Sequence, residues 1–418
     1  MALPTDRRAR ARITTALFAA QALGSSGVLA AATVASIAGA AISGRTSLAG
    51  VPAGVFQLGA AVSALAWSIA SDRLGRRNGL GLGLLAGAAG AAGATIAVIV
   101  HSFPLLVPSI VVMGSGSAAV RLGRFAAAEA HPPAQRGRAV AWVVLGGTVG
   151  SVVGPSLVAP AGRIGNGLTG SSLAGPYAVT LLVYLLAALS LLLFLRPDPK
   201  ALGARIAREH PHPGGEGPAR PWRALLRDPG IVVAVTSVVV AHAVMVMMMG
   251  LTSLHMELAG IGLGGISLVF SVHSFGMYAP SVASGLLADR FGRTATIVSG
   301  AVTLSVACTL APLSDRVPAL VAALFLLGLG WNLCFVAGSA LLADRLAPAE
   351  RGRMQGVNDL LMSGMAAVAS LAGGLLFARA GYGGMALVGI LASALLLAFV
   401  LGRGRALGVG ALPADRGR

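Results

Sequence analysis

Residues 72–77 read Asp-Arg-Leu-Gly-Arg-Arg, and residues 289–294 read Asp-Arg-Phe-Gly-Arg-Thr. A second hexapeptide is repeated at nearly the same spacing. Pro-Ala-Gln-Arg-Gly-Arg at 133–138 returns as Pro-Ala-Glu-Arg-Gly-Arg at 348–353. Two unrelated motifs that recur with offsets of 217 and 215 residues indicate that the chain consists of two related halves.

The sequence around these hexapeptides is strongly apolar. Of the 418 residues, 56% are hydrophobic and only 11% are charged, whereas a soluble protein carries about 25% charged residues. The mean hydropathy is +0.83. This composition excludes a soluble globular domain, a disordered chain, collagen, a coiled coil and a disulfide-rich scaffold, and it predicts an all-α membrane protein.

The apolar segments are long enough to cross a bilayer, which requires about 20 residues. We predict twelve transmembrane helices in two halves of six, at residues 1–195 and 230–402. A cytoplasmic linker (196–229) joins the halves and carries a short interfacial helix around 222–227, and a cytoplasmic tail occupies 403–418. The twelve predicted spans are 14–42, 48–70, 79–100, 104–128, 139–160, 173–195, 230–252, 266–288, 295–313, 317–342, 357–378 and 383–402.

The basic residues predict the orientation of these spans. The chain has 31 Lys and Arg against 14 Asp and Glu, a net charge of +17. Most of the basic residues fall at the N-terminus, in alternate loops, in the linker and in the tail. The positive-inside rule therefore puts both termini in the cytoplasm. The charge is explained by topology, and no nucleic-acid partner is expected. We expect a monomer in a bacterial cytoplasmic (inner) membrane.

The repeated hexapeptides lie within a longer known pattern. Residues 285–293, Gly-Leu-Leu-Ala-Asp-Arg-Phe-Gly-Arg, and residues 150–155, Gly-Ser-Val-Val-Gly-Pro, resemble the loop signature and the fifth-helix motif of the major facilitator superfamily. The resemblance implies a secondary transporter that works by alternating access. The candidate gating residues in the two loops are Asp72, Arg73, Asp289 and Arg290.

Soft metal ligands are concentrated in the seventh and eighth predicted spans. Met245 and Met249 are four residues apart, as are His273 and Met277, so each pair shares one face of a helix. Thioether sulfur and imidazole suit Cu(I). An ionisable residue inside a span, such as His273, is a functional candidate in itself.

This pair of motifs resembles the CcoA-type copper importers of the superfamily. The resemblance implies that Met245, Met249, His273 and Met277 bind copper as the transported substrate, with no resident cofactor. Four further residues are candidate accessory ligands: His242, His255 and Met256 close by in the sequence, and Cys334 in the tenth span.

Two other functions fit the same sequence. The methionines can be an adaptable apolar lining for a small organic substrate, riboflavin or a drug-like molecule. The protein can also be a membrane copper sensor that binds the metal without translocating it.

Proton coupling has two candidates, Arg121 in the fourth span and Asp359 in the eleventh. The shallow position of Asp359 near Arg351 and Arg353 favours the alternative that it is an anchor at a helix end. The sequence has no Walker loop that would bind ATP, and it shows no catalytic constellation. We therefore expect a transporter and not an enzyme.

Overall fold

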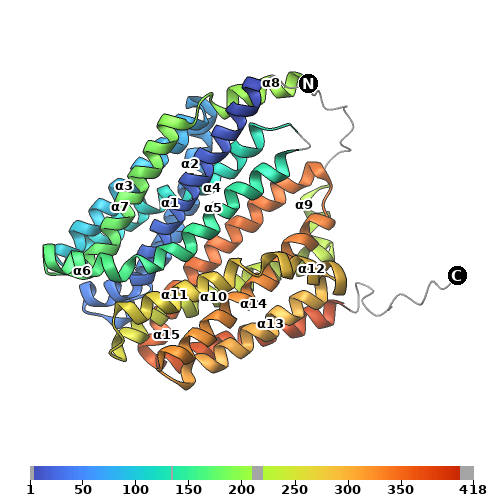
Figure 1. Ribbon diagram of the computed structural model, residues 1–418. Coiled ribbons are helices and arrows are strands. Elements are labelled where there is room, and N and C mark those ends of the chain that lie inside the picture. The colour runs from blue at the N-terminus through green and yellow to red at the C-terminus, as the bar shows by residue number, and fades with distance from the viewer. Residues whose placement is uncertain (1–3, 133–134, 210–219, 405–418) are drawn as a thin grey trace. The chain divides into compact units, whose positions relative to one another are not determined.

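The computed structural model describes residues 4–132, 135–209 and 220–404, and within these ranges every regular element is a helix. The chain divides into two compact units. The first unit comprises Met1–Gly214 together with Gly250–Ser271, and the second comprises Gly215–Met249 together with Val272–Arg418. Figure 1 shows the helices of both units, with the chain coloured from blue to red.

In the first unit, long helices pack side by side, α3 against α4 and α7, and α1 against α5 and α7. Glycines of α5 allow the closest approach. A Cβ at Gly150 would lie 2.0 Å from the carbonyl oxygen of Ala22 on α1, so a larger residue would separate the two backbones. The helices are α1 (Pro4–Ser43), α2 (Val51–Leu74), α3 (Arg76–Ile99), α4 (Phe103–Glu129), α5 (Arg136–Ser156), α6 (Val158–Thr169), α7 (Ala174–Phe194) and α8 (Pro199–Glu209), with a 3₁₀ turn η1 (Thr46–Leu48).

In the second unit, α13 packs against both α14 and α15. Helices α10 and α11 contain residues of both units. The helices are α9 (Trp222–Arg227), α10 (Pro229–Leu258), α11 (Leu263–Tyr278), α12 (Ser281–Phe291), α13 (Arg293–Leu310), α14 (Val317–Asp344) and α15 (Pro348–Gly404), with a 3₁₀ turn η3 (Ala311–Leu313).

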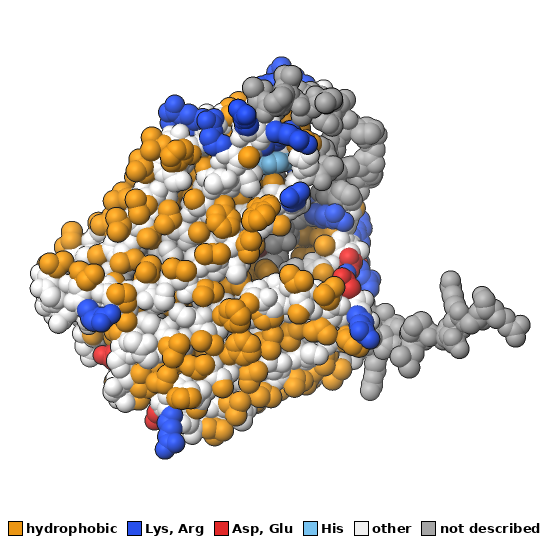
Figure 2. Space-filling view, in the orientation of Figure 1, with side chains coloured by type: hydrophobic (Ala, Val, Ile, Leu, Met, Phe, Trp, Pro, Cys, Tyr) orange, Lys and Arg blue, Asp and Glu red, His pale blue; other side chains and the backbone are white. Residues whose placement is uncertain are grey.

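The described residues contain 11 helical segments that are long and apolar enough to cross a membrane. The last of them, Arg353–Arg403, has 51 residues, more than twice the length that one span requires. Gly381 interrupts it with a φ of 64° and a ψ of −169°, between the predicted spans 357–378 and 383–402. Figure 2 shows hydrophobic side chains over the flanks of the helices, as lipid contact requires.

The linker contains one helix that the sequence analysis did not predict. Helix α8 begins where the Asp198 carboxylate accepts the backbone N–H of Lys200 at 2.9 Å. Leu202 and Ile206, four residues apart, are both buried. An amphipathic helix of this length has too few apolar residues to stand out beside a transmembrane span.

Candidate substrate site

The two repeated hexapeptides build the same ion-pair arrangement in both units. Arg76 pairs with Asp72 (3.0 Å) one turn earlier and with Glu129 (2.7 Å) at the end of α4. Arg293 pairs in the same way with Asp289 and, at 3.2 Å, with Asp344 at the end of α14. Each arginine therefore ties together three helix ends.

A glycine makes each of these loops possible. Gly75 and Gly292 have φ values of +86° and +92°, in a region that side chains rarely adopt. The two other predicted gating residues, Arg73 and Arg290, are exposed, and the Arg290 guanidinium lies 5.4 Å from the centre of the Phe291 ring. Asp72, Arg73, Asp289 and Arg290 thus lie in the last turns of α2 and α12, next to the loops, and none of them lies in a helix centre.

A break in the eighth apolar segment brings polar groups into the second unit. Helix α11 ends at Tyr278 and α12 begins at Ser281, because Pro280 has no N–H to continue the hydrogen-bond ladder. Asn332 of α14 fills the gap: its amide nitrogen donates to the Met277 carbonyl (2.7 Å) and to the Ser281 hydroxyl (2.8 Å). The Asn332 amide oxygen accepts from Ser284 at 2.6 Å. The break is therefore a defined, hydrogen-bonded feature.

An aromatic cluster lies beside this break. The Trp331 ring stacks on Phe335, with centroids 4.8 Å apart and planes at 17°, and meets Tyr278 edge to face at 6.1 Å. Its indole nitrogen donates to Nδ1 of His242 on α10 at 3.2 Å. Trp331 is buried, whereas Phe335, Tyr278 and His242 are half-buried. We call these four residues the Trp331 cluster.

The four residues predicted as copper ligands all belong to the second unit. His273, Met245 and Met277 are buried, and Met249 is half-buried. The Nδ1 atom of His273 lies 2.7 Å from the carbonyl oxygen of Leu324. Since a carbonyl oxygen can only accept, Nδ1 carries the proton and the neutral ring has its lone pair on Nε2. Among the described residues, this Nε2 has no hydrogen-bond partner.

The predicted accessory ligands are dispersed. His242 belongs to the Trp331 cluster, and His255 and Met256 belong to the first unit. The Cys334 thiol donates to the carbonyl oxygen of Ile297 at 3.6 Å, against α13. Within the described ranges, no group of three or more His, Cys, Asp or Glu residues could hold a metal ion.

The two predicted coupling residues occupy different environments. Arg121 is exposed although it lies inside α4. Asp359 is half-buried and accepts a hydrogen bond from Gln355 one turn earlier, at 2.9 Å.

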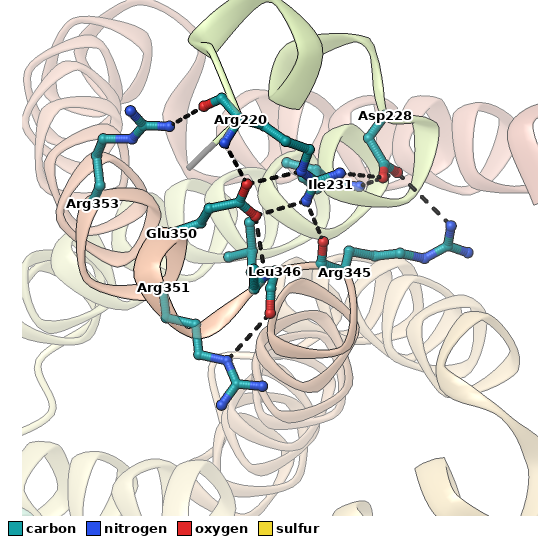
Figure 3. Close-up of polar contacts among 9 residues, drawn as sticks. Arg220, Asp228, Ile231, Arg345, Leu346, Glu350, Arg351 and Arg353 are labelled. Atoms are coloured by element: carbon teal, nitrogen blue, oxygen red, sulfur yellow. Dashed lines mark hydrogen bonds and ion pairs between the residues drawn. The ribbon is translucent and has the colours of Figure 1, made fainter. Parts of the chain in front are cut away.

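The linker is held to the second unit by a carboxylate that sequence reasoning missed. Glu350 is 1% exposed and accepts from the backbone N–H of Arg220 (2.8 Å), from its guanidinium (2.9 and 2.8 Å) and from the N–H of Ala347 (3.0 Å) (Figure 3). These donors, the Arg220 side chain first, lower the pKa of Glu350 to about 2. The only sequence sign was the position of Glu350 inside the repeated hexapeptide, where the first copy has Gln135.

Comparison with known proteins establishes the family. The sequence matches the Major Facilitator Superfamily over residues 13–267 and 252–414, and the chain belongs to this superfamily. It is therefore a multi-pass secondary transporter of the membrane, in a family that is generally not enzymatic.

Three relatives resemble it along most of their length. The uncharacterised MFS-type transporter YdeG of Bacillus subtilis is 36% identical over 92% of this chain and 90% of its own. YddS of the same organism is 34% identical over 92% and 89%. The riboflavin transporter RfnT of Brucella anthropi is 31% identical over 90% and 92%.

Solved structures show the same fold. A bacterial homologue of the human lysosomal transporter Spinster, in an inward-facing and occupied conformation, superposes with a TM-score of 0.70 at 16% identity, covering 97% of this chain and 99% of its own. A D-xylose–proton symporter gives 0.69 at 17% identity, covering 93% and 97%.

Proposed function

We propose that this chain imports a planar aromatic organic molecule of the riboflavin type across a bacterial cytoplasmic membrane. In this proposal the chain has twelve spans, with both termini in the cytoplasm. The observation that carries the proposal is the Trp331 cluster, in which three half-buried rings surround a buried indole. The relative RfnT, named as a riboflavin transporter, supports the same substrate class.

The chemistry of the cluster suits a flat heteroaromatic ring. Aromatic side chains bind such rings by offset stacking and edge-to-face contact. The rings of Phe335 and Tyr278 already have these two geometries with Trp331, 4.8 Å and 6.1 Å between centroids. The His242 ring, whose Nδ1 accepts from Trp331, adds a polar group to this aromatic surface.

The break between α11 and α12 supports a substrate site in this part of the second unit. Transporters of this kind bind substrates beside interrupted helices, where irregular backbone lines a cavity. Asn332 bonds the Met277 carbonyl and the hydroxyls of Ser281 and Ser284 at this break. Polar groups thus lie next to the Trp331 cluster, and the main-chain carbonyl of Met277 has a hydrogen-bond donor.

Energy coupling is assigned to protons. Arg121 is a permanent charge inside α4, and Asp359 is the half-buried acid of α15. A carboxylate that takes up and releases a proton during the transport cycle can couple the accumulation of substrate to a proton gradient. The loop arginines Arg76 and Arg293 lock helix ends through ion pairs and serve gating.

A growth experiment tests the substrate class. A riboflavin-requiring bacterium that lacks its own importer should grow at low riboflavin when it expresses this chain, and it should not grow when it expresses the Trp331→Leu variant at equal membrane levels. Growth that depends on the chain but not on Trp331 would remove the cluster from the site. No growth with either protein would reject the substrate class.

Copper is the second candidate, and His273 favours it. Its Nε2 lone pair is fully buried and has no partner among the described residues, as a metal-binding nitrogen would be in the absence of metal. Met245 and Met277 are buried in the same unit, and thioethers with imidazole suit Cu(I). Under this proposal copper is the cargo and binds Met245, Met249, His273 and Met277.

The copper content of cells with and without the gene separates the two candidates. A copper importer should raise it, and the Met245→Leu/Met277→Leu double variant should abolish the rise while remaining folded, because Leu conserves volume. A sensor would bind copper without changing the cell content. An unchanged copper content together with riboflavin uptake would leave the methionines as apolar lining of the organic site.

A further inference from the structure

A cavity in the first unit is unusually rich in positive charge. Its volume is about 620 Å³, within the usual range for small-molecule sites. It lies between the first turns of α1, the loop after α4 and the start of α5. Figure 2 shows Lys and Arg gathered at the end of this unit where α1 begins and α8 lies. The lining residues that carry the argument are Arg7, Arg10, Arg138, His131, Phe18 and Trp142. We call this cavity the basic pocket.

The floor of the basic pocket is cationic and buried. Arg10 is 8% exposed, and His131 beside it is 9% exposed. His131 donates from Nδ1 to the Ala127 carbonyl at 2.9 Å, and its Nε2 lies 3.4 Å from the Thr14 hydroxyl. Burial, with the neighbouring Arg10 charge, lowers the pKa of His131, so the ring stays neutral and Arg10 carries the charge.

The described lining of the pocket contains no acidic residue. Arg7 and Arg138, both exposed at the rim, add two more guanidinium groups. Three arginines therefore line one cavity, with Arg10 at its buried floor. This arrangement favours an anionic ligand, and guanidinium groups bind phosphate oxygens bidentately.

One wall of the pocket is aromatic. The rings of Phe18 on α1 and Trp142 on α5 meet edge to face, with centroids 6.5 Å apart and planes at 66°. Trp142 is 48% exposed, so its ring offers an uncovered surface. An aromatic wall and a cationic floor in one cavity match a ligand that has an organic body and an anionic end.

We propose that the basic pocket binds the phosphomonoester of an organic molecule. A phosphomonoester carries a charge of about −1.5 to −2 near neutral pH and has three acceptor oxygens, which suits three guanidinium groups better than a single carboxylate does. The ester group then contacts Phe18 and Trp142. This site goes beyond the transport function proposed above, and it does not depend on which substrate crosses the membrane.

Two sources can supply such a ligand from the Arg-rich side of the membrane. One is a free phosphorylated molecule, and the other is the headgroup of phosphatidic acid. Calorimetry on the purified full-length protein, in phosphatidylcholine nanodiscs at about 0.15 M salt to screen exposed charges, distinguishes them. The probes are phenyl phosphate, phenol, inorganic phosphate and a second set of nanodiscs that contain phosphatidic acid.

We expect phenyl phosphate to bind at least tenfold more tightly than phenol or inorganic phosphate. Arg10→Gln should weaken this binding at least tenfold, whereas the exposed control Arg163→Gln in the same unit should leave it unchanged. If Arg10→Gln does not fold, the rim variant Arg138→Gln should show a smaller loss in the same direction. Phosphatidic acid that displaces phenyl phosphate, or that binds alone and depends on Arg10, assigns the site to the lipid.

Three results would overturn the proposal. The first is that neither phenyl phosphate nor phosphatidic acid binds. The second is that Arg163→Gln weakens binding as much as the pocket variants do, which would indicate a diffuse effect of charge. The third is that phenol or inorganic phosphate binds as tightly as phenyl phosphate.

Discussion

The indole nitrogen of Trp331 donates to Nδ1 of His242 at 3.2 Å, and this bond joins α14 to α10 across 89 residues of sequence. Both residues belong to the second unit, and Trp331 also contacts Tyr278 of α11. One buried ring of α14 therefore contacts both α10 and α11. If α10 moves away from α14 during transport, the hydrogen bond between Trp331 and His242 must break.

Replacement of Trp331 should affect the binding and uptake of substrate more than any other substitution. Trp331→Phe keeps a stacked ring but loses the N–H donor, and a net hydrogen bond contributes about 0.5–1.5 kcal/mol. We expect substrate affinity to fall up to about tenfold, and Trp331→Leu to abolish uptake at normal membrane levels. The measurement is the concentration dependence of uptake. Trp67→Phe, which loses a comparable donor to Ser115 in the first unit, is the control and should transport normally.

Asn332 should be essential for the stability of the second unit. Asn332→Leu leaves the Met277 carbonyl without its side-chain donor, removes the acceptor of the Ser284 hydroxyl, and leaves Ser281 with only its bond to the Tyr278 carbonyl. Each buried unsatisfied group costs about 1–3 kcal/mol. We expect a clear fall in the unfolding temperature and in the yield of folded protein in detergent. Asn78→Leu, an exposed site with one local bond to Leu74, should change neither; equal losses in both variants would contradict this account of the break.

The two loop glycines form a matched pair. Both have a backbone conformation that costs a non-glycine residue about 1–3 kcal/mol. A Cβ at Gly292 meets nothing within 4 Å, whereas at Gly75 it would lie 2.6 Å from Oδ2 of Asp198. Asp198 also accepts the N–H groups of Arg76 and Arg77 at 3.2 and 3.0 Å.

Gly75→Ala should therefore be more destabilising than Gly292→Ala. Thermal unfolding of the two variants beside the parent protein measures the difference. In the double variant Gly75→Ala/Asp198→Ala, the part of the destabilisation that comes from the steric contact with Asp198 should be absent. An equal effect of the two single variants would show that the contact with Asp198 carries no cost.

The lowered pKa of Glu350 predicts in which direction the stability of the folded protein changes with pH. Its pKa is about 2 in the folded protein, below its ordinary value of 4.5. A lowered carboxyl pKa contributes stability above pH 4.5 that is lost as the pH falls towards 2. We expect Glu350→Gln to be less stable than the parent by a constant margin between pH 7.5 and 5.

Below pH 4.5 this margin should narrow, because the unfolded parent takes up a proton on Glu350 whereas the folded parent, with its lowered pKa, does not. Unfolding temperatures of both proteins across this pH range test the prediction. Glu257→Gln, which changes an exposed carboxylate, should follow the parent throughout. A margin that already narrows at pH 6 would place the pKa of Glu350 far higher than its contacts imply.

Replacement of Asp359 should affect the accumulation of substrate differently from its exchange across the membrane. If it carries the coupled proton, Asp359→Asn abolishes concentrative uptake in a proton gradient but leaves substrate exchange across the membrane. Proteoliposomes with and without an imposed pH gradient measure both. Gln355→Ala removes the hydrogen bond to Asp359 without removing the acid, and it should retain accumulation. Unchanged accumulation in Asp359→Asn would make this residue an anchor.

The apolar segments and the repeated hexapeptides predict the superfamily and its helical fold, because burial in lipid allows few other structures. The short linker helix predicted around 222–227 is present as α9 (Trp222–Arg227). Helix α8 was missed because its apolar face consists of little more than Leu202 and Ile206.

The candidate site was harder to predict because its contacts are distant in sequence. Asn332 and Ser281 are 51 residues apart, and Trp331 and His242 are 89 apart. Spacing within one helix identifies pairs such as Met245 and Met249, but it carries no information on which neighbour they face. Pro280 was the one local sign of the helix break. The copper ligands remain a prediction.

The most direct test of the central claim is the uptake of radiolabelled riboflavin into proteoliposomes that contain only this purified chain. The account predicts saturable uptake that rises with an inward proton gradient, is lost in Trp331→Leu, and is unaffected by a copper chelator. Uptake no faster than in protein-free liposomes, under conditions where the same preparation accumulates copper in a His273-dependent manner, would contradict it.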